Sequence, residues 1–324
     1  MKKPISKIFT AIVATVLIVA GSAYAQSRNN DQITINIGLY NSSKPSSMVR
    51  KFRPLITLLE KKVSQRLGSS VRIRMQIAKN YDRGIEYLAE GKVDFARFGP
   101  ASYVEAKTEN PGIQILAIES KNRTKVVNGI IATGLHSSIR KMSDLKGESF
   151  AFGDKQSASG RFVAQQFLLR NGITAKDLSR YEYLGRHDIV GVKVGVGDFA
   201  AGAMSEATFR RLLLDGEKIR ELARFPLVAN PWVARDGIDP AIYSALKASL
   251  LEISSAEDSD ELLLLDFNGF VEGANNDYRS VAESMSQNHI FFNDENKKSI
   301  EWVLATSKSK NSSAKGNNLP AAAQ

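Results

Sequence analysis

The sequence contains no cysteine among its 324 residues. Disulfides, thiolate–metal sites and a lipid attached to an N-terminal cysteine are therefore all excluded. Only three histidines are present, and none of them belongs to a cluster with the spacing of a metal site. We therefore expect no metal and no cofactor, and a fold that is stabilised by its hydrophobic core alone.

Long basic stripes are also absent, although the formal net charge is +10. Basic residues are interspersed with acidic ones and gather only in short groups, such as Lys61 and Lys62. Nucleic-acid binding typically uses a basic stripe with aromatic residues between the charges, so we predict no nucleic-acid partner. The positive balance is compatible with a small anionic ligand, although net charge alone identifies no partner.

Long apolar runs are missing, and only a short one lies near the N-terminus. A basic stretch precedes an uncharged apolar run over residues 8–20, and the small residues Ala23 and Ala25 follow. This run is shorter than the ~20 residues that a membrane-spanning helix needs. The pattern predicts a signal peptide over residues 1–25 that is cleaved after export, and we expect the mature protein in the periplasm.

Strands and helices alternate along the rest of the chain. Apolar and polar residues alternate with a period of two over residues 33–39 and 71–77, and residues 48–67 between them have helical spacing. Further strands are expected over residues 114–118, 129–133, 149–153, 181–184, 200–204 and 221–228, and further helices over residues 81–89, 161–169, 188–196 and 239–253. This order predicts an α/β fold with mostly parallel sheets. Residues 307–324 show no apolar periodicity, and we predict that they are disordered.

A turn rich in hydroxyl groups, Ser157-Ala158-Ser159-Gly160, lies between a predicted strand and a predicted helix. The first N–H groups of a helix have no partner within the helix, and the helix dipole places partial positive charge there. Such a turn can therefore hold a tetrahedral anion. The alternative is that Ser159 is only an N-cap, and the residues alone leave both interpretations open.

Several motifs occur together in a fixed order along the chain. They are Asn80-Tyr81, Phe98-Gly99-Pro100-Ala101-Ser102-Tyr103, Asp144-Leu145-Lys146-Gly147, Gly153-Asp154-Lys155-Gln156-Ser157-Ala158-Ser159-Gly160, His187-Asp188 and Gly269-Phe270-Val271. In these motifs the chain resembles the phosphonate-binding periplasmic proteins of ABC transporters, over roughly residues 33–280. The resemblance implies a type II periplasmic binding protein fold, with two lobes, each a mostly parallel sheet flanked by helices.

The resemblance also implies a domain division and partners. Lobe 1 would comprise residues 26–132 and 232–306, and lobe 2 residues 133–231, with two hinge crossings near residues 132 and 231. The ligand would be a small phosphorus oxyanion (phosphonate, phosphite or phosphate) trapped between the lobes. The protein would be a monomer that delivers this ligand to an inner-membrane ABC permease.

The resemblance assigns contacts with the oxyanion to Ser157, Ala158, Ser159, His187 and Tyr81. Family members usually carry Thr at the position of Ala158, so one side-chain donor is lost here. We expect a bound anion to raise the pKa of His187. From the residues alone, His187 would be a surface or capping group and Tyr81 a ring that packs over a helix start.

Four further positions concern the rest of the pocket. Tyr103 is expected to form a wall of the cleft rather than a direct contact. Where binders of aminoalkyl phosphonates have acids that hold the ammonium group, this chain has Asn230 and, within one residue of the other position, Glu206. An aromatic position of the family is occupied by Val127. We therefore expect a ligand without an amine, and an Asn230→Asp substitution to favour aminoalkyl phosphonates.

Two other functions are compatible with parts of this pattern. Ser157 or Ser159 with His187 would suit a hydrolase, but the Gly-x-Ser-x-Gly nucleophile elbow is absent, so we predict no catalytic residues and no enzyme. A protein of the same fold that presents its closed form to a membrane receptor or sensor kinase is the second alternative. The sequence leaves transport and sensing open.

Overall fold

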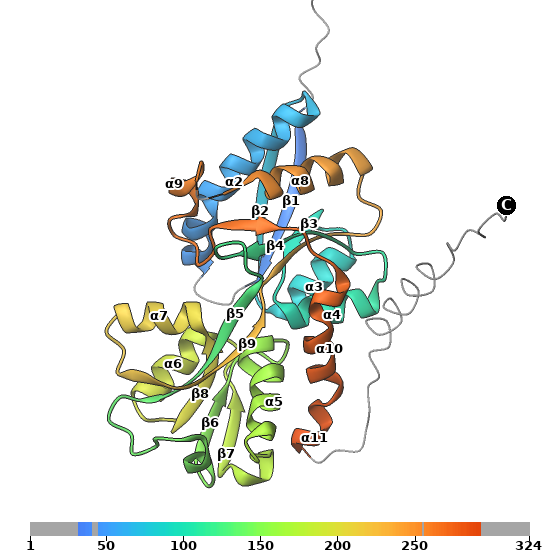
Figure 1. Cartoon of the computed structure of the whole chain (residues 1–324). Coiled ribbons are helices and arrows are strands. Elements are labelled where there is room, and N and C mark those ends of the chain that lie inside the picture. The colour runs from blue at the N-terminus through green and yellow to red at the C-terminus, as the bar shows by residue number, and fades with distance from the viewer. Residues whose placement is uncertain (1–31, 41–44, 255, 293–324) are drawn as a thin grey trace, which may run out of the picture.

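The computed structural model describes residues 32–40, 45–254 and 256–292. The predicted signal peptide and the predicted disordered tail lie outside the described residues. Figure 1 shows two lobes, each with its own sheet, joined by extended segments of chain. Within the described ranges, no helix combines the length and apolar character that crossing a membrane requires.

The first lobe contains a six-stranded sheet in the order β11-β4-β10-β3-β1-β2. Its strands are β1 (Ile33–Tyr40), β2 (Val71–Ala78), β3 (Phe95–Arg97), β4 (Gln114–Ser120), β10 (Pro231–Ala234) and β11 (Gly269–Val271). Strand β1 pairs in parallel with β2 and β3, whereas β10 runs antiparallel to β3 and β4. Four of these strands therefore run in one direction, as expected for a mostly parallel sheet.

Helices cover the faces of this first sheet. They are α2 (Pro45–Leu67), α3 (Tyr81–Ala89), α4 (Pro100–Glu109), α8 (Pro240–Glu252) and the short α9 (Ser259–Leu262). Helix α2 buries an apolar stripe at helical spacing, which includes Phe52, Leu55 and Leu59. This stripe packs with Ile35 and Ile37 of β1 into one hydrophobic cluster, so the pattern read from the sequence is what docks the helix on the sheet.

The second lobe contains a five-stranded sheet in the order β7-β6-β8-β5-β9. Its strands are β5 (Val126–Gly134), β6 (Ser149–Phe152), β7 (Arg180–Tyr183), β8 (Ala201–Ser205) and β9 (Ile219–Val228). Its helical segments are η1 (Met142–Leu145), the π-helical turn η2 (Ala158–Phe162), α5 (Val163–Arg170), η3 (Ala175–Asp177), α6 (His187–Gly195) and α7 (Glu206–Leu214). Strand β5 alone runs antiparallel to its neighbours, so this sheet too is mostly parallel.

The chain passes between the two sheets at two points. It leaves the first sheet after Ser120 and enters the second at Val126, and it returns between Val228 and Pro231. The sequence analysis places the first passage near residue 132, which lies inside β5, whereas its second passage near residue 231 coincides with the start of β10. In each sheet the strand that follows a passage runs against the main direction; in the first sheet β11 does so as well.

The C-terminal helices add a third connection. After η4 (Asn275–Tyr278), helix α10 (Arg279–Ser286) packs against both α4 of the first lobe and α5 of the second, and α11 (Asn288–Phe292) packs against α5. Figure 1 shows α10 running beside both lobes. The expected division assigns residues 232–306 to lobe 1, whereas the structure places residues 288–292 against lobe 2. A single hydrophobic cluster continues through this region from one lobe to the other.

Candidate functional site

The ends of the first-lobe strands meet the helix starts of the second lobe. Tyr40 ends β1, and Gly99 follows β3 and begins α4. Ligands of open α/β sheets bind beyond the carboxyl ends of the strands. The junction of these ends with the Ser157–Gly160 turn of the second lobe is therefore where a ligand site is expected.

An aromatic wall forms the first-lobe side of this junction. The rings of Tyr40 and Tyr81 stack with their centroids 3.9 Å apart, and Phe98 lies 6.0 Å beyond Tyr40. The Tyr40 hydroxyl accepts hydrogen bonds from the Gly99 N–H and, at 3.3 Å, from the Ser102 hydroxyl. Burial raises the pKa of Tyr40 to about 12 and that of Tyr81 well above its usual range, so both hydroxyls keep their protons at neutral pH.

The second-lobe side is the turn predicted to hold an anion. The Ser157 side chain caps the helix by accepting the Gly160 N–H at 2.9 Å, and the Ser157 carbonyl accepts the N–H groups of Arg161 and Phe162. The N–H groups of Ala158 and Ser159 have no such acceptor in the described part of the chain. These two N–H groups are therefore the free donors of the first turn, as a cradle for an anion requires.

His187, the first residue of α6, orients Ser157. Its Nε2 lies 3.0 Å from the Ser157 Oγ, and its Nδ1 accepts the Ser205 N–H at 3.2 Å. Because Nδ1 accepts, the proton of the neutral ring is on Nε2, which donates to Ser157. Burial lowers the pKa of His187 to about 4, so the ring is neutral at pH 7 in the described structure. That a bound anion raises this pKa stays a prediction.

Ser157 also links the two lobes. Its hydroxyl hydrogen-bonds with the hydroxyl of Tyr81. Since Ser157 Oγ already accepts from His187 and Gly160, its own proton is the one that it donates to Tyr81. The structure thus brings together three of the predicted residues, Tyr81, Ser157 and His187, from two lobes.

Two glycines allow this close packing. A Cβ added at Gly160 would lie 2.9 Å from the Ser157 Oγ and 3.0 Å from the His187 Nε2. A Cβ added at Gly153 would lie 2.9 Å from the His187 ring, and the Gly153 N–H donates to the Gly160 carbonyl at 2.8 Å. Any side chain at these positions would displace the groups that orient Ser157.

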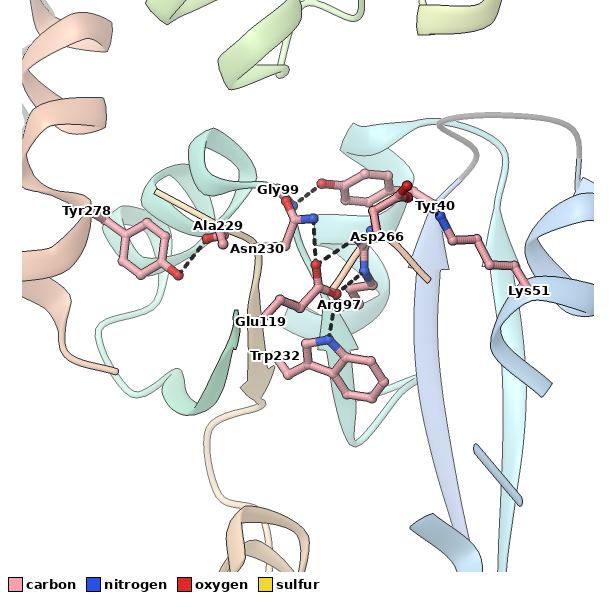
Figure 2. A network of polar contacts seen from close by, with 10 residues as sticks. All are labelled: Tyr40, Lys51, Arg97, Gly99, Glu119, Ala229, Asn230, Trp232, Asp266 and Tyr278. Atoms are coloured by element: carbon pink, nitrogen blue, oxygen red, sulfur yellow. Dashed lines mark hydrogen bonds and ion pairs between the residues drawn. The ribbon is translucent and has the colours of Figure 1, made fainter. Parts of the chain in front are cut away.

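A buried polar network borders the junction on the first-lobe side. Glu119 at the end of β4 is 4% exposed and accepts hydrogen bonds from Arg97, Trp232 and Asn230, as Figure 2 shows. The sequence analysis missed both Glu119 and Tyr40. Their position at the carboxyl ends of predicted strands was the available signal.

The remaining predicted residues are engaged elsewhere. Tyr103 is fully buried; its hydroxyl donates to Asn275, and its ring meets Tyr278 edge-on at 4.7 Å. Glu206 accepts hydrogen bonds from Asn128 at 2.9 Å and Arg210 at 2.6 Å. Its partial burial favours a higher pKa, but these partners hold the pKa of Glu206 below its usual value, so its charge is already paired.

The chain is similar to several known proteins. A family model described as ABC transporter, phosphonate, periplasmic substrate-binding protein matches residues 37–278. The chain is 26% identical over 243 residues to a probable ABC transporter phosphite binding protein of Prochlorococcus marinus, with 70% of this chain and 81% of that protein covered. It is 25% identical over 289 residues to a phosphate-import protein of Mycolicibacterium smegmatis, with 82% and 86% covered.

The fold is similar to that of solved structures as well. A Prochlorococcus marinus protein solved in complex with methylphosphonate superposes with a TM-score of 0.68 at 20% identity, over 78% of this chain and 96% of that one. The predicted two-lobe α/β fold of the periplasmic binding proteins is thereby confirmed.

Proposed function

Since the chain belongs to the family of periplasmic substrate-binding proteins of phosphonate ABC transporters, we propose that it captures a small phosphorus oxyanion between its lobes and delivers it to the transporter's permease. The observation that carries this proposal is the Ser157–Gly160 turn, with free N–H groups at Ala158 and Ser159 and a hydroxyl oriented by His187. All of these donors are neutral, so they bind an anion by directed hydrogen bonds and by the helix dipole.

The oxyanion bridges both lobes in this proposal. The second lobe supplies the turn, and the first supplies the Tyr81 hydroxyl, which already reaches Ser157. Ser159 is 8% exposed and Ala158 3% exposed, so a bound anion loses most of its contact with water there. Hydrogen bonds to a charged acceptor contribute about 1.5–3 kcal/mol each, and several of them give tight and selective binding.

The rest of the ligand is small and carries no amine. Asn230 offers no countercharge, the Glu119 carboxylate is occupied by its four donors, and Glu206 is paired with Arg210. An ammonium group brought beside these three residues would therefore remain unpaired, which is costly. We propose phosphite, methylphosphonate or phosphate as the ligand, bound by a monomer without a catalytic step, in a chain exported by cleavage of residues 1–25.

Calorimetric titration of the purified protein tests this function. Phosphite, methylphosphonate and phosphate are compared with aminoethylphosphonate, and we expect at least one of the first three to bind more tightly than the aminoalkyl compound. The Gly160→Ala variant, in which the added Cβ displaces Ser157 and His187, should bind this ligand about tenfold more weakly or worse, given the hydrogen bonds it disturbs.

Gly134→Ala is the matched control for this substitution. An added Cβ at Gly134 has its first neighbour, the Val194 carbonyl oxygen, at an ordinary 3.5 Å, so its affinity should equal that of the wild type. Absence of binding to all phosphorus oxyanions, or equal affinity in both glycine variants, would contradict the proposed site.

A further inference from the structure

The Glu119 carboxylate is saturated with donors from the protein. Its Oε1 accepts from the Arg97 Nε and the Trp232 Nε1, and its Oε2 accepts from the Arg97 Nη2 and the Asn230 Nδ2, the last two at 2.9 Å. An ionised carboxylate has about four lone-pair sites, and all four are filled here. Figure 2 shows the three donor residues converging on this one acid. Glu119 therefore binds no ligand itself and instead fixes its neighbours.

Asn230 is the neighbour that lies in the second passage between the two sheets. Only the NH2 group of an amide can donate to a carboxylate, so Glu119 determines which end of the Asn230 amide faces the sheet. The carbonyl oxygen Oδ1 is then the other end of the side chain, which accepts no hydrogen bond from the described residues, and Asn230 is only partly buried. A free amide could present either end, but this one presents an acceptor.

The backbone places Asn230 beside the aromatic wall. Strand β10 pairs antiparallel with β3, and the Phe98 N–H donates to the Pro231 carbonyl at 3.0 Å. One step further along this pair, Asn230 lies next to Gly99, whose N–H donates to the Tyr40 hydroxyl. Because Tyr40 stacks on Tyr81, the Asn230 amide lies at the border of the surface that meets Ser157.

We propose that Arg97 and Glu119 are positioning residues that hold the Asn230 carbonyl oxygen as a fixed hydrogen-bond acceptor, and that this acceptor selects an oxyanion carrying a proton on one oxygen. The inference rests on the proposed function. Singly protonated phosphonate, phosphite and phosphate ions have a P–OH group that donates to Oδ1, whereas sulfonate and sulfate have acceptor oxygens only. A site built for a donor discriminates against an analogue that lacks it, because a group of the site then stays unpaired.

The amide is better suited to this task than an acid. Asn230→Asp would place a second carboxylate where Nδ2 now lies 2.9 Å from the Glu119 Oε2. Two carboxylates at such a distance share a proton rather than both ionising. The substitution would therefore disturb the hydrogen bonds of Glu119, and the gain in binding of aminoalkyl ligands that the sequence analysis expects would be reduced.

Methylphosphonate and methanesulfonate form a matched pair of probes. At about pH 6 both are tetrahedral monoanions with one methyl group, and only the phosphonate carries a hydroxyl proton. We expect calorimetry to show that the wild type prefers methylphosphonate by about tenfold to a hundredfold. Asn230→Ala leaves Glu119 its bonds to Arg97 and Trp232, and it should reduce this preference at least tenfold.

Two further variants test the positioning residues. Glu119→Gln allows the Asn230 amide to turn, and the double variant Arg97→Met/Glu119→Gln does so without leaving an unpaired buried charge. In both, the ratio of the two affinities should fall, whereas a merely structural defect would weaken both probes alike. Asn128→Ala is the control, because Asn128 also donates to a carboxylate, that of Glu206 at 2.9 Å. In this variant the ratio of the two affinities should equal that of the wild type.

The outcomes separate this inference from the proposed function. If phosphite, methylphosphonate and phosphate all fail to bind the wild type, the function itself is wrong, and the inference falls with it. If they bind but the ratio is near one, or stays unchanged in Asn230→Ala, only the selection by Asn230 is overturned. The inference would also be overturned if the ratio of the methylphosphonate and methanesulfonate affinities changed in Asp154→Asn but not in Asn230→Ala. The acceptor for the P–OH group would then be the Asp154 carboxylate.

Discussion

A neutral histidine orients the Ser157 hydroxyl. His187 is 5% exposed, and the energetic cost of desolvating an imidazolium exceeds what the nearby Asp188 returns. The ring therefore acts through its shape and its two hydrogen bonds rather than through charge. In the described structure the ring stays neutral between about pH 5 and 8, because its pKa of about 4 lies below this range. Its Nε2 therefore donates to Ser157 throughout this pH range.

The same burial predicts a pH dependence of stability. The pKa of His187 is about 4 when folded and 6.5 in the reference state, so the unfolded chain binds the proton more tightly. The stabilisation of the folded state by the buried neutral His187 ring is complete above about pH 6.5 and is lost as the pH falls toward 4. Between pH 7 and 5 the ligand-free protein should lose about 2 kcal/mol of unfolding free energy through this residue.

The His187→Gln variant isolates this contribution, because a glutamine amide can still hydrogen-bond to Ser157 but does not titrate. Urea unfolding at both pH values should show that the wild type loses about 2 kcal/mol more than the variant. An equal loss in the two proteins would mean that His187 is not neutral when buried.

Individual site residues were predictable only where a local motif carries them. Ser157 and His187 lie in short motifs next to predicted helix starts, and their mutual contact spans only 30 positions. Glu119 belongs to no local motif, and its place after a predicted strand does not show its role, because that role depends on Asn230, 111 positions away. Tyr40 belongs to a regular strand, and nothing in the alternation distinguishes a last residue that faces the cleft from one that faces the core.

At the scale of the element, periodicity predicted the bounds of the strongly patterned segments to within about three residues. Strand β2 and helix α3 begin at the predicted residues, Val71 and Tyr81. Helix α4 was missed, although Pro100 at its first position is a typical helix start, because Ala101, Ser102 and Tyr103 are all buried and leave no amphipathic period. The lobe that α10 and α11 contact was not predictable either, since helical spacing shows a buried face but not its partner.

The attachment of α11 to the second lobe gives a prediction at this scale. Phe291 is fully buried, with its ring edge-on to Phe152 at 5.8 Å and near Tyr181 at 6.4 Å. Truncation of such a buried ring typically costs about 3–5 kcal/mol. Phe291→Ala should therefore lower the urea midpoint strongly, as measured by circular dichroism.

Ile290→Ala in the same helix is the control for Phe291→Ala. Its side chain is 47% exposed, and a surface substitution of this kind changes stability by only about 0.5 kcal/mol or less. If both variants unfolded at the same urea concentration, α11 would not be packed on the second lobe in solution.

At the scale of the whole molecule, the two lobes are held in contact by both polar and apolar groups. The Tyr81 hydroxyl of the first lobe meets Ser157 of the second, and the Tyr278 hydroxyl of the C-terminal connection donates to the Ala229 carbonyl in the second passage at 3.1 Å. The first of these contacts is at the proposed ligand site, whereas the second is at the second passage between the sheets, the expected hinge. Opening of the cleft must therefore break the former and can retain the latter, as expected for hinge motion around a ligand.

An oxyanion that contacts both lobes binds the closed form more tightly than the open one, and it shifts the population by that difference in affinity. The absence of native cysteine allows two cysteines to be introduced for spin labels, at the exposed Val49 of α2 and Val196 after α6. Saturating methylphosphonate should shorten and narrow the distance distribution between the labels. Tyr81→Phe keeps the ring that stacks on Tyr40 but loses the hydroxyl, so closure should need about tenfold or more additional ligand. A distribution that does not respond to bound ligand in the wild type would show that binding and lobe closure are uncoupled in this protein.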